Sequence, residues 1–425
     1  MKTFVGYAIF LAAAWLGVAS QFDAYAKEYW IYFGTSTEGT TAEMNERGIG
    51  RSEGIYVGKY DDATGSISDV RLALAARSSG YLATAPGKNL LYFVGSLDGK
   101  DGWANAYACK VDPKTGDLTV INGKPTTGQG VCHTSVREDG KFLTAANYSS
   151  GDFSILPLAE DGAVLDATAK YRKDGSGPLK RRQDHPYGHS SYFLTTDGVC
   201  RVFMSDLGSD KIYIARLDEK TGALTDDPDV PYLATPAGAG PRHLDFATDA
   251  QGRTIVFSIN ELDSTLSAFR IDFKEGKSER LGTWSTLEEE FRKKLTDEET
   301  LVDGKTYLYG NKTAAIAFAT TSEGKNVVYA TNRGQNTIVA FDADSIVKCK
   351  ETVDFPLIQR ISTRGSFPRY ATLDPAKRHY IVSNKKSGLV WVYEINQKTG
   401  ALSPVGDDPV KLAWVIAGAF VPVQK

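Results

Sequence analysis

The sequence predicts an all-β protein, a seven-bladed β-propeller, from its composition, its alternation and its repeats. Of the 425 residues, 21 are Tyr, 19 are Phe and 41 are Gly, whereas only 3 are Met. This composition favours strands and tight turns over helices. Apolar and polar residues alternate along short segments, as they do in strands. A strand–corner–strand pattern then recurs along the chain, which is typical of repeat folds.

Seven copies of this pattern align on a polar or glycine residue at the corner between two strands. The corners are Gly34, Gly95, Asn147, Asp206, Asn260, Asn332 and Asn384. Their mean separation is about 58 residues, which is enough for the four strands of a propeller blade. A parallel β-helix or a β-sandwich would not give steps this long. Because a ring of blades must close, we expect the extended segment 29–35 to pair with the strands of the last blade.

One step, between Asn260 and Asn332, is longer than the others. The excess falls in 287–300, whose sequence LEEEFRKKLTDEET is charged and helix-prone, so we expect an inserted surface helix there. Four further turns share a glycine after a polar pair, and this glycine supplies the positive φ that a tight hairpin needs. These turns contain Gly65, Gly116, Gly222 and Gly400.

The first 26 residues have the layout of a secretory signal peptide. Lys2 precedes an apolar run, and Ala-Tyr-Ala at 24–26 offers small residues for cleavage. The apolar run of about 16 residues is short for a membrane anchor, which needs about 20, so we expect cleavage after Ala26. The mature chain, 27–425, is then a single propeller domain in the periplasm or outside the cell.

Export also bears on the four cysteines, because an oxidising compartment permits disulfides. Cys109, Cys132, Cys200 and Cys349 allow three pairings, and the sequence does not choose among them. For Cys132, a buried or paired thiol is a better interpretation than a nucleophile.

Charge and motifs exclude several classes of partner and cofactor. Lys and Arg number 49 against 52 Asp and Glu, so no basic excess would attract nucleic acid. The two histidines of HPYGH (185–189) are separated by Pro186 and Gly188, which argue against the helix that would aim both at a metal. Phosphate-binding and dinucleotide-binding loops are not found. We therefore expect no metal, no cofactor and no membrane contact after cleavage. The sequence leaves the oligomeric state open, and a monomer is the default expectation.

The unusual polar residues gather where the inner strands of a propeller begin, facing the central channel. Arg242, Arg333 and Arg369 show this bias, as do four of the five histidines, His133, His185, His189 and His243. An arginine in a partly dry channel is a fixed fork for carboxylate or phosphate. A neighbouring glutamate such as Glu261 balances that charge or takes a proton from water. The loop 175–183, GSGPLKRRQ, is interpreted as a flexible connection.

Several short motifs occur in a specific order along the chain. They are NYSSG (147–151), GSGPLKRRQ (175–183) leading to His189, DLG (206–208), GPRHL (240–244), NEL (260–262) and NRG (332–334). With them the chain, from about Tyr29 onward, resembles the lactonase family of seven-bladed β-propellers. That family includes the propeller-type 6-phosphogluconolactonases and the fungal 3-carboxy-cis,cis-muconate lactonizing enzymes.

The resemblance implies a site built from a histidine, an arginine, a glutamate and a second arginine on successive blades. The matching catalytic residues are His189, Arg242, Glu261 and Arg333. Around them we expect the substrate-binding residues His133, Asn147, His185, His243, Asn260, Asn332 and Arg369. Family members often carry an acidic residue where Ala315 stands. That difference and the signal peptide both count against a phosphorylated sugar as substrate.

The resemblance therefore implies a hydrolase that opens a sugar-type or other small anionic lactone, similar to a 6-phosphogluconolactonase, and the signal peptide implies that this hydrolase is exported. Two alternatives stay open. The same residues could hold an organic acid and close a lactone ring, as in a muconate-type cycloisomerase. The protein could also be a non-catalytic propeller that binds a small anion, a glycan or a protein. An enzyme requires His189, Arg242, Glu261 and Arg333 to meet at one cavity, whereas a binding platform does not.

Overall fold

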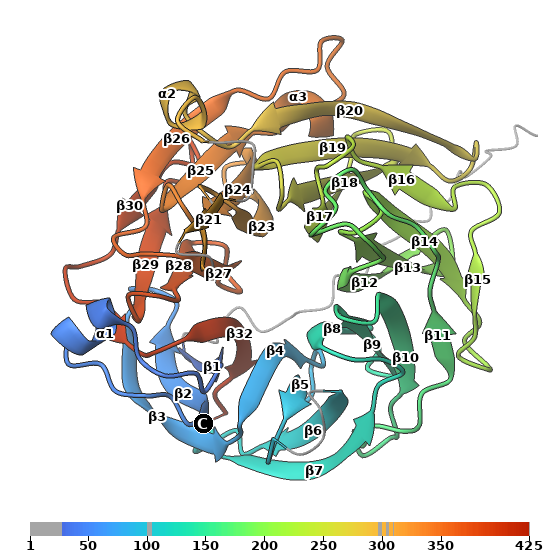
Figure 1. Ribbon diagram of the computed structural model, residues 1–425. Helices are drawn as coiled ribbons and strands as arrows, with labels where there is room; N and C mark the ends of the chain where they lie inside the picture. The colour runs from blue at the N-terminus through green and yellow to red at the C-terminus, as the bar shows by residue number, and fades with distance from the viewer. Residues whose placement is uncertain (1–27, 100–103, 296–299, 303–305, 309, 425) are drawn as a thin grey trace, which may run out of the picture.

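Seven antiparallel sheets stand side by side around a central axis, and the chain runs once round the ring (Figure 1). The computed structural model describes residues 28–99, 104–295, 300–302, 306–308 and 310–424. The prediction of a seven-bladed propeller is confirmed. The predicted signal peptide, 1–26, lies outside the described residues. Within the described ranges, no helix has the length and apolar character needed to span a membrane.

In each of the first four blades, four strands follow one another from the axis outward, and they are named here in that order. Blade 1 contains β32 (Val415–Pro422), β1 (Glu28–Thr35), β2 (Gly54–Asp61) and β3 (Ile67–Ala75). Blade 2 contains β4 (Ser78–Thr84), β5 (Leu90–Ser96), β6 (Asn105–Val111) and β7 (Leu118–Pro125). Blade 3 contains β8 (Val131–Val136), β9 (Phe142–Asn147), β10 (Asp152–Pro157) and β11 (Ala169–Tyr171). Blade 4 contains β12 (Gly188–Thr196), β13 (Val199–Asp206), β14 (Lys211–Leu217) and β15 (Leu224–Asp226), and β16 (Tyr232–Ala234) also pairs with β14.

The last three blades follow the same plan. Blade 5 contains β17 (Pro241–Thr248), β18 (Thr254–Asn260), β19 (Thr265–Asp272) and β20 (Lys277–Ser285). Blade 6 contains β23 (Thr313–Thr320), β24 (Asn326–Asn332), β25 (Thr337–Asp342) and β26 (Leu357–Ser362). Blade 7 contains β27 (Pro368–Leu373), β28 (His379–Asn384), β29 (Leu389–Ile395) and β30 (Leu402–Pro404), and β31 (Val410–Lys411) pairs with β29. Each of the seven predicted corners is the last or next-to-last residue of the second strand of its blade.

The two ends of the described chain close the ring in a single sheet. The C-terminal strand β32 pairs with β1, with Trp30 opposite Val421, and Figure 1 shows the two side by side. The segment 29–35 does close the ring, as expected, but the sheet concerned is blade 1 and not the last blade. The C-terminal strand moves to the first blade because blade 1 lacks an innermost strand of its own.

In the described part of the insertion between Ser285 and Thr313, there is less helix than predicted. The helix α2 covers only Glu289–Arg292, and Glu288 at its N-cap makes no side-chain hydrogen bond to it. A two-stranded hairpin follows, β21 (Thr300–Val302) with β22 (Thr306–Leu308). Two other short helices were not predicted, α1 (Ala42–Glu46) and α3 (Asp344–Val347). A helix without a cap and without a buried face gains little from its charged sequence.

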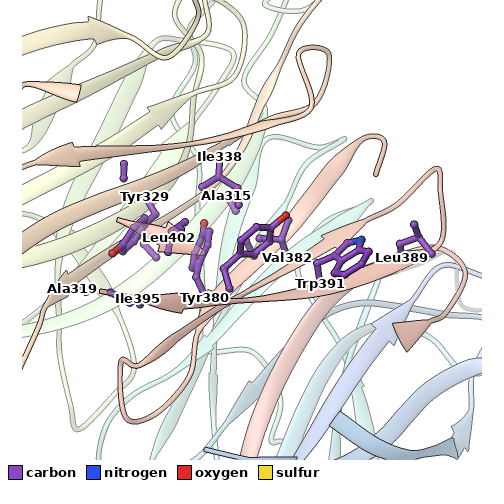
Figure 2. Packing of buried hydrophobic residues seen from close by; sticks show 14 of the residues in the cluster. Ala315, Ala319, Tyr329, Ile338, Tyr380, Val382, Leu389, Trp391, Ile395 and Leu402 are labelled. Carbon is purple, nitrogen blue, oxygen red and sulfur yellow. The ribbon is translucent and has the colours of Figure 1, made fainter. Parts of the chain in front are cut away.

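The core consists of seven apolar clusters, one between each pair of neighbouring blades. Successive residues of one strand therefore enter opposite clusters, as Val328 and Tyr329 of β24 do. Figure 2 shows the cluster between blades 6 and 7, where the rings of Tyr329 and Tyr380 stack with centroids 5.1 Å apart. Because both faces of each blade are buried, the second strands of the blades are apolar on both sides, as in the buried strand β24.

All four cysteines are free thiols. Cys109 and Cys200 belong to two different interblade clusters, so burial accounts for them. Cys132 and Cys349 are partly buried. None of the three possible disulfide pairings of these cysteines is therefore formed in this structure.

The predicted hairpin glycines all have positive φ, and each also touches the preceding blade. Gly65, Gly116, Gly222 and Gly400 have φ between 72° and 76°. A Cβ on Gly116 would lie 2.7 Å from the ring of Trp30. That ring cannot easily move, because its Nε1 donates to the carbonyl of Pro113 and its side chain is buried. Glycine is thus required here both for backbone conformation and for contact between blades.

We predict that Gly116→Ala destabilises the protein more than Gly324→Ala does. Both glycines have nearly equal φ, +75° and +77°, but a Cβ on Gly324 would meet nothing within 4 Å. The left-handed conformation costs alanine about 1–2 kcal/mol at either position. Overpacking against Trp30 should add about 1–3 kcal/mol at position 116 only. Urea unfolding measures the free energy of unfolding of both variants, and equal losses would show that the close approach to Trp30 adds nothing to the destabilisation.

Candidate active site at one end of the central axis

Every innermost strand carries a β-bulge near its first residues. In blade 3, for example, Val131 pairs with Asn147 and His133 with Ala146, so Cys132 is the extra residue. By the same pairing the extra residues of the other blades are Gly80, His189, Arg242, Arg369 and Ile416, and in blade 6 Ala314 and Ala315 together face Thr331. A bulge interrupts the alternation of side chains and re-aims one of them. The seven bulges therefore gather one residue from each blade at the same end of the axis.

A second set of residues comes from the corners of the blades. Tyr148, Glu261, Arg333 and Lys385 each follow a corner asparagine directly. Their backbone N–H groups donate to carbonyls of the segment that enters the inner strand of the same blade, as from Glu261 to Gly240 at 2.8 Å and from Arg333 to Lys312 at 2.8 Å. The repeated bond holds each of these residues beside the bulge of its own blade.

The two sets enclose a cavity of about 510 Å³. Its lining includes the bulge residues Gly80, Cys132, His189, Arg369 and Ile416, the corner neighbours Tyr148, Glu261 and Arg333, and the loop residues Arg182, Asn311, Lys312 and Phe367. This volume suits a ligand of small-metabolite size. Most of the charged residues in the lining are cationic.

Glu261 is the centre of the charged residues. Its Oε2 accepts from Arg242 Nε at 2.9 Å and pairs with Arg333 Nη2 at 2.7 Å, and His189 Nε2 lies 3.6 Å away. Its Oε1 accepts from Arg182 Nη2 at 3.0 Å, with Lys312 Nζ at 4.0 Å. One carboxylate thus serves three guanidinium groups. Since all of these side chains are largely buried, the arrangement is fixed rather than solvated.

The protonation states follow from burial and from these neighbours. Burial alone would raise the pKa of Glu261, but Arg333, His189, Arg182 and Arg242 hold it well below its usual value, so the carboxylate is ionised. Burial and the charge of Arg242 lower the pKa of His189 to about 4, so its ring is neutral at pH 7. Burial raises the pKa of Cys132 to about 12. Its Sγ donates to the carbonyl of His189 at 3.3 Å, and this protonated thiol is not an activated nucleophile.

The structure brings most of the predicted catalytic residues to the cavity. His189, Glu261 and Arg333 line it, as does Arg369. Arg242 is set behind Glu261, where it holds the carboxylate and is not part of the lining. Ala315 lies in the bulge of blade 6 and is buried.

The other predicted binding residues lie away from the cavity lining. The amides of Asn147, Asn260 and Asn332 bond to side chains of their own blades, for example from Asn260 Nδ2 to Ser267 Oγ at 2.9 Å. Those of Asn147 and Asn332 also accept from Thr126 and Thr286, each of which follows the last strand of the preceding blade. His133 and His243 pack with Tyr81 in an aromatic cluster farther along the axis. His185 stacks on Tyr187, with ring centroids 4.0 Å apart.

Arg182 and Lys312 line the cavity but were not among the predicted residues. Arg182 comes from the loop 175–183, which is anchored and not a loose connection. Gln183, fully buried, donates to the carbonyl of Leu207 at 2.9 Å and to Asp210 Oδ1 at 2.7 Å. Arg182 also donates to the hydroxyl of Tyr148 at 3.0 Å. The run Lys180-Arg181-Arg182 was the available signal, because adjacent cations in a glycine-rich loop suit an anion site.

Comparison with known proteins agrees with this fold. A family model described as "Lactonase, 7-bladed beta-propeller" matches residues 30–415. A 6-phosphogluconolactonase of Bacillus subtilis is 28% identical over 354 residues, 83% of this chain and 90% of that protein. One from Formosa agariphila is 26% identical over 363 residues, 84% of this chain and 92% of that protein. The solved structure of a periplasmic gluconolactonase from Pseudomonas aeruginosa is 25% identical, with a TM-score of 0.73, and the match covers 93% of this chain and 100% of that one.

The family model extends over nearly the whole described ring, from β1 to the start of β32. Because this match covers far more than half of the sequence, the chain belongs to the lactonase family of seven-bladed β-propellers.

Proposed function

We propose that this protein is an exported hydrolase that opens a small anionic lactone. The observation that carries the proposal is a neutral histidine, His189, placed in a cation-rich cavity beside an ionised carboxylate. The periplasmic gluconolactonase of similar fold and the predicted signal peptide support export. The 6-phosphogluconolactonases among its relatives support a lactone as the substrate class.

In this proposal His189 is the general base and Glu261 is not. A base needs a free lone pair that can reach the attacking water. Both oxygens of Glu261 are occupied by guanidinium groups, which also hold its pKa well below the usual value. His189 is neutral, and the imidazolium formed on proton uptake at Nε2 would face Glu261 Oε2 3.6 Å away. Glu261 therefore stabilises the protonated base and positions the arginines.

Hydrolysis then proceeds in two steps. Water adds to the lactone carbonyl as His189 takes its proton, and the oxyanion that forms is stabilised by the N–H groups of Arg333. The tetrahedral intermediate collapses with cleavage of the ring C–O bond, and His189 returns the proton to the departing alkoxide oxygen. The product is an open-chain hydroxy acid, and its new carboxylate remains among cations until release.

The test of the base is the variant His189→Gln. The mature chain, 27–425, is given neutral and anionic sugar lactones, with spontaneous hydrolysis subtracted. We expect the variant to lose between 10²- and 10⁴-fold in kcat, as for removal of a general base. His185→Gln, on a neighbouring histidine outside the cavity lining, should keep its rate. Absence of any rate above background in the wild type would overturn the hydrolase proposal.

The pH profile provides an independent check on His189. Because burial lowers its pKa to about 4, the imidazole stays unprotonated down to about pH 5. We expect kcat/KM to be constant from pH 8 to about pH 5 and to fall below that as the base becomes protonated. The measurement uses initial rates of lactone loss followed by NMR. A profile that instead fell below pH 7 would assign the base to a group of ordinary pKa.

Glu261→Gln tests the structural role of the carboxylate. Removing the charge leaves Arg182, Arg242 and Arg333 without their shared partner, and breaking such a buried pair costs about 3–5 kcal/mol. A matched control is Glu290→Gln on exposed α2, which should change the free energy of unfolding by less than about 1 kcal/mol.

The difference between the wild type and Glu261→Gln should also depend on pH. The folded pKa of Glu261 lies below its ordinary value of 4.5, so the stabilisation is complete above that pH and is lost as the pH falls further. Urea unfolding of both proteins at pH 7 and at pH 3.5 measures this difference in the free energy of unfolding. A variant as stable as the wild type at pH 7 would show that Glu261 is not the counter-ion of the arginines.

A further inference from the structure

Arg369 differs from the other arginines of the site in its partners. Arg182, Arg242 and Arg333 all bond to Glu261. Arg369 is the bulge residue of β27 and lines the cavity, yet no hydrogen bond or ion pair joins its guanidinium to any residue that the structure describes. A buried or half-buried cation without a counter-ion is costly, and it is retained where a ligand supplies the anion.

More positive charge surrounds Arg369. Lys385 follows the corner residue Asn384, which pairs with Pro368, so Arg369 and Lys385 flank one pair of blade 7. The ammonium of Lys385 lies 3.3 Å from Glu38 and 4.1 Å from the centroid of the Trp414 ring, and its side chain is 14% exposed. Burial and the charge of Arg369 lower the pKa of Lys385 to about 8. The two cations therefore sense one another, with Glu38 as the acid nearest to Lys385.

The backbone in front of Arg369 is held in an unfavourable conformation. Phe367 has a φ of +61°, which is rare for a bulky residue. Two hydrogen bonds fix it: its N–H donates to Asn336 Oδ1 at 2.8 Å, and its carbonyl accepts from the N–H of Lys385 at 2.9 Å. Strain of this kind persists where surrounding bonds enforce it, and it is concentrated at functional sites. Here it sets the path of the chain into the bulge that presents Arg369.

The cavity wall beyond Arg369 carries no charge. The lining there is formed by Ser78 and Gly80 of blade 2 and by Ile416 of blade 1. The positive charge near Glu261 is already balanced in part by that carboxylate, whereas the blade 7 side offers Arg369 with open space beside it. The cavity thus has one cationic region whose guanidinium groups bond to Glu261, and a second region, at Arg369, where no carboxylate of the described residues bonds to the guanidinium.

We propose that Arg369, supported by Lys385, binds an anionic group of the substrate that is separate from the lactone carbonyl. The group is a carboxylate or a phosphate monoester, since both fit the fork of an arginine. The inference rests on the proposed lactone hydrolysis and adds its specificity: lactones with a second, charged group are preferred to neutral ones. The carbonyl is placed toward His189 and Arg333, and the charged group toward blade 7.

The test compares three lactones: neutral glucono-δ-lactone, glucarolactone with a carboxylate, and 6-phosphogluconolactone. We expect the wild type to favour at least one charged lactone in kcat/KM by about tenfold or more, as charge-assisted bonds allow. Arg369→Gln should reduce that preference about tenfold, and Arg369→Lys should reduce it less, because it keeps the charge but not the fork. The charged lactone whose advantage is lost in Arg369→Gln shows whether the site binds a carboxylate, a phosphate or both.

A matched control is Arg364→Gln, in the connection between β26 and β27. Arg364 lies over the ring of Trp391 and pairs with Asp407, outside the cavity lining, so its loss changes the net charge equally and should leave the preference intact. If the wild type treated charged and neutral lactones alike, or if Arg369→Gln kept the full preference, the inference would be wrong. Urea unfolding of each variant ensures that only folded proteins are compared.

Binding of open-chain acids separates this inference from the proposed activity. Calorimetry measures gluconate, glucarate and 6-phosphogluconate on the wild type and on Arg369→Gln. Tighter binding of a doubly charged acid that is lost in the variant supports the anion site even if no lactone is opened, in which case the hydrolase proposal alone fails. Equal binding of gluconate and the doubly charged acids would overturn the inference even if lactones are hydrolysed.

Discussion

Seven β-bulges, all at the same end of the central axis, determine what this propeller presents to a ligand. In a regular strand, side chains alternate between the two neighbouring interblade clusters, so both faces of each blade are buried in the core. One extra residue breaks that alternation and directs a side chain toward the axis. Because the innermost strands of the seven blades are equivalent, their seven bulges lie at the same end of the axis. The site is thus a property of the ring, and no single blade contains it.

Electrostatics then decides which of these residues act chemically and which hold the others in place. Glu261 is shared by Arg182, Arg242 and Arg333, which come from a loop and from two different blades. Removal of these charges from water is compensated only while they stay together, so the ion pairs fix the geometry more than they add stability. Burial, and after it the charge of Arg242, lowers the pKa of His189 and keeps its ring neutral, although Glu261 acts in the opposite direction. A cation-rich cavity with a neutral histidine is suited to hold an anion and to move a proton beside it.

The fold was predictable to a large extent because its signals are local. Each corner residue, such as Asn147 or Asn332, marks the end of a second strand, and each hairpin glycine has the φ that its sequence requires. The insertion was predicted less well, since charge alone does not make a helix, and among its described residues only Glu289–Arg292 form one. Ring closure was placed in the wrong blade because nothing local to 29–35 tells which sheet receives the C-terminal strand.

The residues of the candidate site also divide into those with a local signal in the sequence and those without one. His189, Glu261, Arg333 and Arg369 were named from their place in the blade and from the family resemblance, and they line the cavity. The corner asparagines do not line it, since their amides bond within their own blades and, for Asn147 and Asn332, to a threonine that follows the preceding blade. Arg182 was missed because it reaches Glu261 across 79 residues of sequence on a loop without periodicity.

The amino-acid sequence by itself determined the number of blades, the position of their corners and the residue types available at the hub. Alternation and turn chemistry act between near neighbours in the chain, so these features can be recognised without coordinates. Only the tertiary structure decided which cations share Glu261 and which one, Arg369, faces the cavity without a partner among the described residues. Those pairings depend on distances between side chains from different blades and loops, and such distances are set by closing the ring.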